Sequence, residues 1–281
     1  MTSRPRAFAI GWPVAHSRSP LLHGHWLKTY GLEGTYEAVP VREGEVGAFF
    51  DQIRAGEWRG GNVTLPHKHT ALALADERDA AAGAIGAANT LVERDGRLLA
   101  SNTDGRGFVS NLNAQSPGWR GSGGPAVILG AGGAARAILW ALLAEGVERV
   151  RLVNRTREKA EMLAAPYGSR VEVVDWSGRA GALGDAILLA NTTSLGMVAM
   201  PPLDIDLAGL PEAASVADVV YAPLETTLLA SARARGNPAV DGLGMLLHQA
   251  VPGFEAWFGV RPKVTEELRA LIVADLTAAR H

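Results

Sequence analysis

The chain has 281 residues and contains no cysteine, which excludes disulfide bonds, thiolate metal sites and a cysteine nucleophile. It also has no large excess of charge of either sign, because it contains 27 basic and 29 acidic residues and its net charge is −2. The basic residues are dispersed, so a nucleic-acid surface is not expected. The seven histidines show no metal-site spacing, and no metal is expected.

Long apolar runs are absent as well. No stretch approaches the roughly 20 residues needed to cross a bilayer. The N-terminal segment leads directly into an expected strand and lacks the apolar core of a signal peptide. We therefore expect a cytoplasmic protein that acts on a small molecule, with no membrane partner. The sequence leaves its state open between a monomer and a homodimer.

Strand and helix patterns alternate along the chain, which predicts an α/β fold with largely parallel sheets. Strands are expected near 6–10, 35–41, 60–65, 126–130, 148–153, 171–174, 186–190, 216–221 and 239–240. Helices are expected near 20–30, 43–54, 66–75, 105–114, 243–257 and 264–279, and a hairpin over 89–101 with its turn at Asp95-Gly96. Ser19 followed by Pro20 predicts a helix start with Ser19 as the N-cap.

This order suggests an open α/β domain over 1–104, a Rossmann dinucleotide-binding domain over 105–240, and closing helices over 241–281. By pattern alone, those last helices could pack on either domain.

The most informative stretch is the apolar strand at 126–129 that leads into a glycine loop and then an Ala- and Leu-rich helix ending at Gly146. Gly130, Gly132 and Ala135 match the dinucleotide fingerprint, in which glycines let the backbone approach a pyrophosphate at a helix N-terminus. The expected cofactor-binding residues of this loop are Gly130, Ala131, Gly132, Gly133 and Ala134. A plain strand-to-helix turn and an S-adenosylmethionine-binding loop are the competing interpretations.

The tip of the next expected strand bears on the identity of the cofactor. An NAD-binding domain usually places Asp or Glu there, but this chain has Asn154, Arg155 and Thr156. A guanidinium pairs with a 2′-phosphate, whereas an acid would repel it. We therefore expect NADP(H), with Arg155 as the clamp, Thr156 as a hydroxyl donor and Asn154 on the ribose. Arg157 and Lys159 fit either the phosphate site or a solvated helix face.

Small polar residues gather at the ends of the expected strands of the first domain, where ligands bind in open sheets. The clusters contain His16 to Pro20, Gly61 to Lys68, Asn89-Thr90 and Ser101 to Asp104. Each has a simpler explanation: Ser17, Ser19 and Asp104 can cap helices, and Lys68 can be a solvated residue of a first helical turn. Reduction of a carbonyl by NADPH requires a positioned proton donor, and Lys68 and Asp104 are the candidates.

Taken together, these segments resemble the shikimate dehydrogenase family over essentially the full length of the chain. The matching segments are GWPVAHSRSP at 11–20, NVTLPHK at 62–68, GAANT at 86–90, NTDGRG at 102–107, GAGGA at 130–134, NRT at 154–156, NTTSLGM at 191–197, YAP at 221–223 and GLGMLLHQ at 242–249.

The resemblance implies reversible, NADPH-dependent reduction of 3-dehydroshikimate to shikimate, with Lys68 and Asp104 as the catalytic pair. It implies that the substrate carboxylate is held by Ser17, Ser19 and Tyr221, and the ring hydroxyls by Asn62, Thr64, Asn89, Asp104 and Gln249. It further implies that the nicotinamide side of the cofactor is contacted by Thr193, Ser194, Met197, Val219, Gly242 and Met245. Because Gln249 lies near the C-terminus, the closing helices should return to the first domain.

Two alternatives remain at this stage. One is a quinate/shikimate dehydrogenase of broad specificity, since quinate differs by one hydroxyl on the carboxylate-bearing carbon. The other is a non-catalytic NADP(H)-sensing protein, although such a protein would need neither Lys68 nor Asp104.

Overall fold

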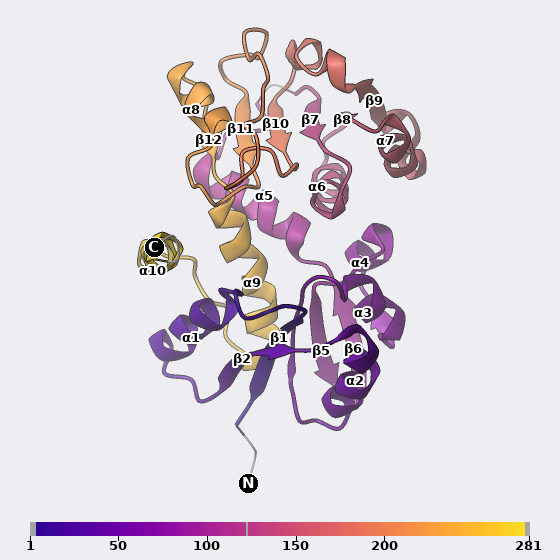
Figure 1. Ribbon diagram of the computed structural model, residues 1–281, viewed down its shortest axis with the longest axis vertical. Coiled ribbons are helices and arrows are strands. Elements are labelled where there is room, and N and C mark those ends of the chain that lie inside the picture. Colours follow the sequence, from indigo (N-terminus) through magenta and orange to yellow (C-terminus); the bar gives the residue numbers. More distant parts are fainter. Residues whose placement is uncertain (1–3, 122, 279–281) are drawn as a thin grey trace. The chain divides into compact units, whose positions relative to one another are not determined.

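The computed structural model describes residues 4–121 and 123–278, which form two compact units (Figure 1). The first unit comprises Met1–Thr103 and Gln249–His281, and the second comprises Asp104–His248. The chain therefore passes between units twice, after Thr103 and inside helix α9 (Leu243–Phe258). The second passage lies beyond the sequence-based boundary at 240/241. The described residues do not include residues 1–3, which begin the N-terminal segment discussed above. They also exclude Ala279 of the last expected helix.

The first unit contains a six-stranded sheet in the order β2-β1-β3-β5-β6-β4. The strands are β1 (Arg6–Gly11), β2 (Thr35–Pro40), β3 (Gly60–Val63), β4 (Glu77–Arg78), β5 (Thr90–Arg94) and β6 (Arg97–Ser101). β1 runs parallel to β2 and β3, whereas β5 is antiparallel to both β3 and β6. The expected hairpin is confirmed, with positive φ angles of 54° at Asp95 and 74° at Gly96.

Strand β1 is buried on both faces of this sheet. Phe8 and Ile10 enter an apolar cluster with α2 (Val46–Arg54), whereas Ala7 and Ala9 enter another cluster with Trp257 of α9. Because side chains alternate along a strand, apolar residues at successive positions supply both clusters. The central strand therefore lies between two apolar layers.

The remaining helices of the first unit are α1 (Ser19–Thr29), α3 (Lys68–Leu74), α4 (Ala80–Ile85) and α10 (Glu266–Ala278). The prediction of Ser19 as the N-cap of α1 is wrong, because Arg18 occupies the cap position and Ser19 is already helical. The hydroxyl of Ser17 instead accepts the N–H of Ser19 at 3.3 Å. Sequence analysis missed β4 and α4, which are too short to show a periodic apolar pattern.

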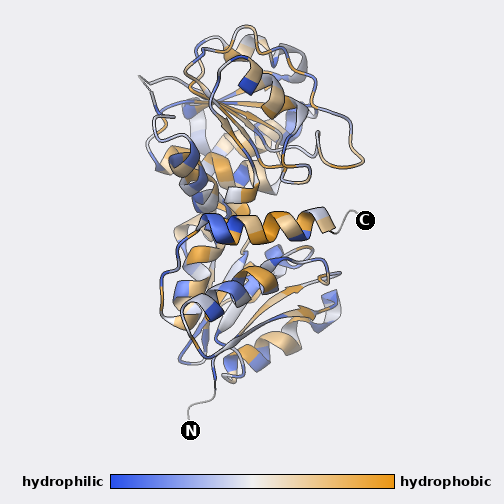
Figure 2. Ribbon diagram, turned by 90° about the vertical axis from the view of Figure 1, so that its left-hand side faces the viewer, coloured by the Kyte–Doolittle hydropathy of each residue, from blue (hydrophilic) through white to orange (hydrophobic). Residues whose placement is uncertain are grey.

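The C-terminal helices pack on the first unit, which confirms this part of the predicted fold class. The indole of Trp257 in α9 donates to the carbonyl of Leu91 at 2.9 Å. In α10, the residues at every fourth position, Leu268, Ile272 and Leu276, form a buried apolar stripe. The ribbon of this helix, which leads to the C-terminus in Figure 2, carries much of the orange that marks hydrophobic residues. Among the described residues, no helix is long and apolar enough to cross a membrane.

The second unit contains six parallel strands in the order β12-β11-β10-β7-β8-β9. They are β7 (Ala126–Leu129), β8 (Val150–Asn154), β9 (Val171–Asp175), β10 (Leu188–Asn191), β11 (Ser215–Asp218) and β12 (Ala239–Val240). The helices of this unit include α5 (Asp104–Gln115), α6 (Gly133–Ala144), α7 (Arg157–Ala164) and α8 (Thr227–Ala234). This is the strand order of the doubly wound dinucleotide fold, and the order reverses between β7 and β10.

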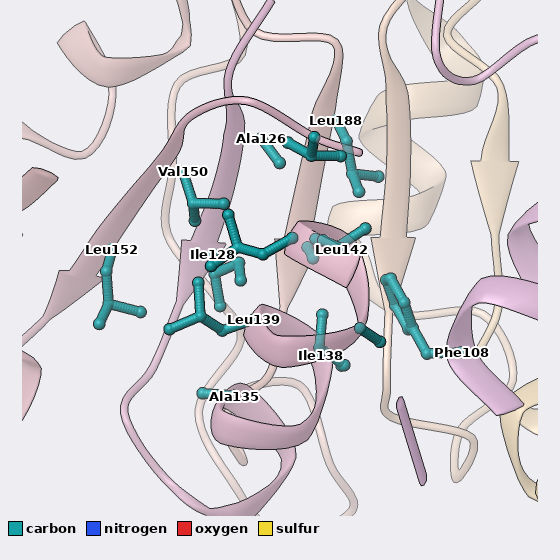
Figure 3. Close-up of a cluster of buried hydrophobic side chains, with 14 of the residues drawn as sticks. Phe108, Ala126, Ile128, Ala135, Ile138, Leu139, Leu142, Val150, Leu152 and Leu188 are labelled. Atoms are coloured by element: carbon teal, nitrogen blue, oxygen red, sulfur yellow. The ribbon is translucent and has the colours of Figure 1, made fainter. Parts of the chain in front are cut away.

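The core of the second unit packs α6 against the central strands (Figure 3). Ile138, Leu139 and Leu142 of α6 lie among buried residues of β7, β8 and β10, and Phe108 of α5 joins them. These strands are apolar at nearly every position because both of their faces are covered. Helix α5 also approaches α6 closely at Gly105, where an added Cβ would lie 2.3 Å from the carbonyl oxygen of Ala137.

This close approach gives a stability prediction. Gly105→Ala should destabilise the protein by about 1–3 kcal/mol, because α5 must move away from α6 to accommodate the methyl group. The matched control is Gly24→Ala in α1, where an added Cβ meets nothing within 4 Å. That control should be neutral or stabilising by up to about 1 kcal/mol. Urea unfolding followed by circular dichroism measures both changes, and equal midpoints for the two variants would contradict the packing argument.

Candidate active site

The polar clusters of the first unit meet at one edge of its sheet. β1 and β3 are parallel, so their carboxyl ends, after Gly11 and Val63, lie side by side. β5 is antiparallel to β3, and Thr90 at its start pairs with Asn62. Thr90 also pairs with Ser101 at the end of β6. Segments far apart in the sequence are therefore brought to a common edge.

Asn89 is the most connected side chain at this edge, and it is 3% exposed. Its Oδ1 accepts from the hydroxyl of Thr90 at 2.9 Å and from the backbone N–H of Thr103 at 2.9 Å. Its Nδ2 donates to Oγ1 of Thr103 at 3.0 Å and to Oε1 of Gln249 at 3.4 Å. A buried amide satisfied in this way is rigid, so Asn89 organises its neighbours.

Gln249 reaches the same edge from α9. Its Oε1 accepts from Asn89 and, also at 3.4 Å, from the hydroxyl of Thr103. The sequence separation is 160 residues from Asn89 and 146 from Thr103, so no local pattern could show this contact. The return of the C-terminal segment, expected from the family resemblance, is thus present in the structure.

Asn62 is held by a tyrosine that sequence analysis missed. The hydroxyl of Tyr36 in β2 donates to Oδ1 of Asn62 at 2.6 Å. Burial raises the pKa of Tyr36 well above its usual range, and hydrogen bonds with Ser19 and Asn62 oppose that rise. Tyr36 therefore stays protonated and remains a donor. Nδ2 of Asn62 in turn donates to the carbonyl of Asn89 at 3.3 Å, which joins the two amides.

Lys68 is the first residue of α3, directly after the turn that follows β3. Its carbonyl accepts the N–H of Ala88 at 2.9 Å, which fastens the helix start beside the segment that leads to Asn89. The ring of His67 contacts the carbonyl of Val41 at 2.6 Å and is buried. His67 is thus a packing residue. Asp104 begins α5 in the second unit, and its pairing with Lys68 stays a prediction.

His23 is a second buried histidine, and it stacks on Tyr36 with ring centroids 4.0 Å apart. Burial lowers the pKa of His23 to about 3, so the imidazole is neutral at ordinary pH. Among the residues that the structure describes, no group of histidine, aspartate and glutamate side chains forms a candidate metal site.

In the second unit, the glycine loop lies between β7 and the start of α6. Gly130 has a φ of +111°, and an added Cβ would lie 2.7 Å from Oγ1 of Thr192. Gly132 is the N-cap of α6 and carries no side chain that could cover the helix terminus. The N-terminus of a helix favours an anion, so this loop fits a pyrophosphate group.

The basic residues after β8, which were predicted near the 2′-phosphate, differ in the contacts that they make. Nδ2 of Asn154 donates to the carbonyl of Thr156 at 2.8 Å, which closes the turn. Arg157 forms ion pairs with Asp175 and Glu161, both at 2.8 Å, so the structure favours its helix-surface role. Arg155 and Lys159 are exposed, and no ion pair of residues 4–121 and 123–278 includes either. These two cations suit a 2′-phosphate better than Arg157.

The turn after β10 is built around Asn191, which is fully buried. Its Oδ1 accepts from the N–H of Thr193 at 3.1 Å and from the hydroxyl of Thr193 at 2.7 Å. Its Nδ2 donates to the carbonyl of Leu195 at 3.1 Å and to Oδ1 of Asp218 at 3.0 Å. Burial raises the pKa of Asp218 to about 6, against the opposing effect of hydrogen bonds from Val220, Thr226 and Asn191.

The segments after β11 and β12 also touch one another. Gly242 donates its N–H to the carbonyl of Val220 at 3.3 Å, and an added Cβ there would lie 2.3 Å from the carbonyl oxygen of Val219. Val198 donates to the carbonyl of Ala222 at 3.0 Å. The predicted nicotinamide contacts after β10, β11 and β12 thus come from loops that adjoin at one edge of the sheet. Met197 is 45% exposed there.

Family models match three parts of the chain. The shikimate dehydrogenase substrate-binding domain matches residues 9–91, shikimate/quinate 5-dehydrogenase matches 117–194, and the shikimate 5′-dehydrogenase C-terminal domain matches 242–271. The shikimate dehydrogenase (NADP⁺) of Mesorhizobium japonicum is 55% identical over 271 residues, which are 96% of each chain. The chain belongs to the shikimate dehydrogenase family. Another member, the shikimate dehydrogenase (NADP⁺) of Azorhizobium caulinodans, is 54% identical over 97% of each chain.

Solved structures support the same fold. Shikimate 5-dehydrogenase of Thermus thermophilus, in complex with NADP(H) and shikimate, has a TM-score of 0.84 and 37% identity, covering 96% of this chain and 99% of its own. Quinate dehydrogenase of Corynebacterium glutamicum, in complex with NAD, has a TM-score of 0.86 and 30% identity, covering 96% and 99%. A 5-ketofructose reductase of Gluconobacter has a TM-score of 0.87 and 32% identity, covering 99% and 100%. The fold is thus shared by enzymes with different names.

The contrast between the two arginines gives a prediction on the coenzyme. Arg155→Ala should raise the KM for NADPH by about 10- to 100-fold, the loss of a charge-assisted contact, while activity with NADH hardly changes. Arg157→Ala is the matched control, because its guanidinium is engaged by Asp175 and Glu161. Steady-state kinetics with each coenzyme measures the effect. Equal losses with NADPH and NADH in Arg155→Ala would exclude its contact with the 2′-phosphate.

Proposed function

We propose that this chain catalyses the reversible, NADPH-dependent reduction of 3-dehydroshikimate to shikimate. The observation that carries the proposal is membership of the family over nearly the whole chain, with 55% identity to a shikimate dehydrogenase (NADP⁺). The resemblance places this reaction in the shikimate pathway, which leads to the aromatic amino acids. The sheet edge of the first unit adds a physical reason, because its neutral amides and hydroxyls suit a ring that carries several hydroxyl groups.

The substrate is assigned to the sequence-predicted residues of that edge. Ser17 and Ser19, together with Tyr221 of the second unit, hold its carboxylate by hydroxyl donation. The ring hydroxyls are assigned to the remaining residues, Asn62, Thr64, Asn89, Asp104 and Gln249. The hydrogen bonds of Asn62 with Tyr36 and of Asn89 with Thr103 support this assignment, because they fix both amides before a ligand arrives.

The coenzyme is assigned to the second unit. Its pyrophosphate lies on the loop that contains Gly130, Ala131, Gly132, Gly133 and Ala134, and its adenosine 2′-phosphate on Arg155, Thr156 and Lys159, with Asn154 at the ribose. The nicotinamide side is assigned to Thr193, Ser194, Met197, Val219, Gly242 and Met245. The positive φ of Gly130 and the exposed side chain of Arg155 support these assignments.

Bound NADPH supplies the hydride. The residues of the chain must then protonate the oxygen of the reduced carbonyl, and Lys68 and Asp104 are assigned this task as an acid–base pair. The Lys68 ammonium donates to the carbonyl oxygen, stabilises the negative charge that develops there and supplies the proton. The Asp104 carboxylate holds the ammonium and hydrogen-bonds a substrate hydroxyl. In the reverse direction, Lys68 takes up the hydroxyl proton.

A broader enzyme that also oxidises quinate is the second candidate, and the similarity to quinate dehydrogenase favours testing it. Paired assays of shikimate and quinate, each with NADP⁺ and NAD⁺, separate the two. A strong rate with quinate and NAD⁺ would contradict the assignment to shikimate and NADP⁺. Binding of NADP⁺ without turnover of either substrate would instead indicate an NADP(H)-sensing protein.

Lys68→Ala tests the catalytic role. We expect kcat for shikimate oxidation to fall by at least about 100-fold, the scale of acid–base catalysis, with little change in affinity for NADP⁺. Lys28→Ala removes the same charge from an exposed position near the end of α1 and serves as the control. Initial rates at the nicotinamide absorbance band and calorimetric titration with NADP⁺ measure both quantities. Near-normal turnover in Lys68→Ala would remove this residue from the mechanism.

A further inference from the structure

Asp218 is the last residue of β11, and its side chain lies inside the second unit with 2% of the residue exposed. Three donors converge on its carboxyl group. Oδ1 accepts from Nδ2 of Asn191 and from the N–H of Val220, both at 3.0 Å, and Oδ2 accepts from the hydroxyl of Thr226 at 2.8 Å. No ion pair within the described ranges includes Asp218, so neutral donors hold this buried acid.

The first of these contacts determines how Asn191 is oriented. An ionised carboxylate only accepts hydrogen bonds, so the Nδ2 end of the Asn191 amide must face Asp218. The Oδ1 end then faces Thr193, where it accepts from both the N–H and the hydroxyl. The hydroxyl of Thr193 is itself an acceptor for the N–H of Leu195 at 3.1 Å. A flipped amide would place the Nδ2 donor against the N–H of Thr193 and the Oδ1 acceptor against the carboxylate of Asp218.

The second contact acts on the loop after β11. The N–H of Val220 bonds to the carboxyl group two residues before it, which turns the chain at the end of the strand. The carbonyl of Val220 then accepts the N–H of Gly242. One carboxyl group therefore fixes the two segments from which the proposed function draws Thr193 and Val219.

The third contact, from Thr226, connects Asp218 to the start of helix α8. Thr226 donates to Oδ2 of Asp218 and accepts the N–H of Leu229 at 3.3 Å as the N-cap of α8. Among the described residues, no hydrogen bond joins the hydroxyl of Thr226 to the loops at Thr193 and Val219. Thr226 thus offers a way to disturb the same carboxyl group without touching its two loop contacts.

We propose that Asp218 is a positioning residue that holds the loops after β10 and β11 in the arrangement that receives the nicotinamide ring. It acts through Asn191 and Val220 and does not itself touch the coenzyme. The proposal rests on the proposed function, which assigns Thr193 and Val219 to the nicotinamide side.

The test compares two ligands of the same protein. Adenosine 2′,5′-bisphosphate carries the 2′-phosphate and adenine but no nicotinamide, whereas NADP⁺ carries all of them. For Asp218→Ala we expect the Kd of NADP⁺ to rise, while the Kd of adenosine 2′,5′-bisphosphate stays within twofold of wild type. We expect kcat for shikimate oxidation to fall by about 10- to 100-fold, the scale of a misplaced reacting group. Calorimetry and initial rates measure the two effects, and circular dichroism verifies that the variant is folded.

Asp218→Asn is the conservative variant, and it should keep most of the activity that Asp218→Ala loses. Its Oδ1 can still accept from Asn191 and Val220, while its Nδ2 can donate to the oxygen of Thr226. We therefore expect Asp218→Asn to retain kcat within about fivefold of wild type, since a hydrogen bond to a neutral acceptor is only modestly weaker. Thr226→Val is the structural control, and it should lower the thermal midpoint while kcat stays near that of wild type.

Several outcomes would overturn the proposal. They are an unchanged kcat in folded Asp218→Ala, a loss of adenosine 2′,5′-bisphosphate affinity equal to the loss of NADP⁺ affinity, or a kcat in Thr226→Val as low as that of Asp218→Ala. If Asp218→Ala does not fold, Asn191→Ala cuts the same link at its other end and is judged by the same criteria. The ligand comparison needs no turnover. It therefore decides the proposal even if wild-type protein fails to oxidise shikimate, an outcome that would count against the proposed function alone.

Discussion

Within each of the two units, the positions of the polar segments depend on one constraint. A buried amide side chain must find hydrogen-bonding partners for its donors and its acceptor. Asn89 meets this requirement at the sheet edge of the first unit through Thr90, Thr103 and Gln249. Asn191 meets it in the second unit through Thr193, Leu195 and Asp218. In each case the amide joins segments that are distant in the sequence, so these segments cannot move independently without breaking hydrogen bonds. Rigid sheets alone would not give these segments fixed positions.

Much of the fold was predictable because its patterns are local. The apolar runs of the parallel strands, the Asp95-Gly96 turn and the strand–glycine–helix sequence around Gly130 each depend on neighbouring residues only. The errors are local as well: Ser19 looked like an N-cap, but the hydroxyl of Ser17 takes the N–H of Ser19 and the helix begins one residue early. Two short elements, β4 and α4, contain too few residues to show a period.

The candidate site was predictable only in part. Lys68, Asn62 and Asn89 stand out because small polar residues are unusually dense near the strand ends of the first unit, and the resemblance to a family added Gln249. Tyr36 and Asp218 gave no such signal, since their importance comes from pairing across strands. Tyr36 reaches Asn62 from β2, and Asp218 meets Asn191 through the register of β10 with β11. Likewise, only the structure distinguishes Arg157, which pairs with Asp175 and Glu161, from Arg155.

The first unit is assembled from both ends of the chain, and this has a consequence for biosynthesis. The carbonyl of Leu91 accepts from the indole of Trp257, and the indole of Trp26 donates to the carbonyl of Lys263. The second unit is contiguous from Asp104 to His248. As the chain leaves the ribosome, the contiguous second unit is complete once His248 has been added, whereas the first unit is complete only after its last helices have been translated. The usual order, in which the N-terminal domain matures first, is therefore reversed.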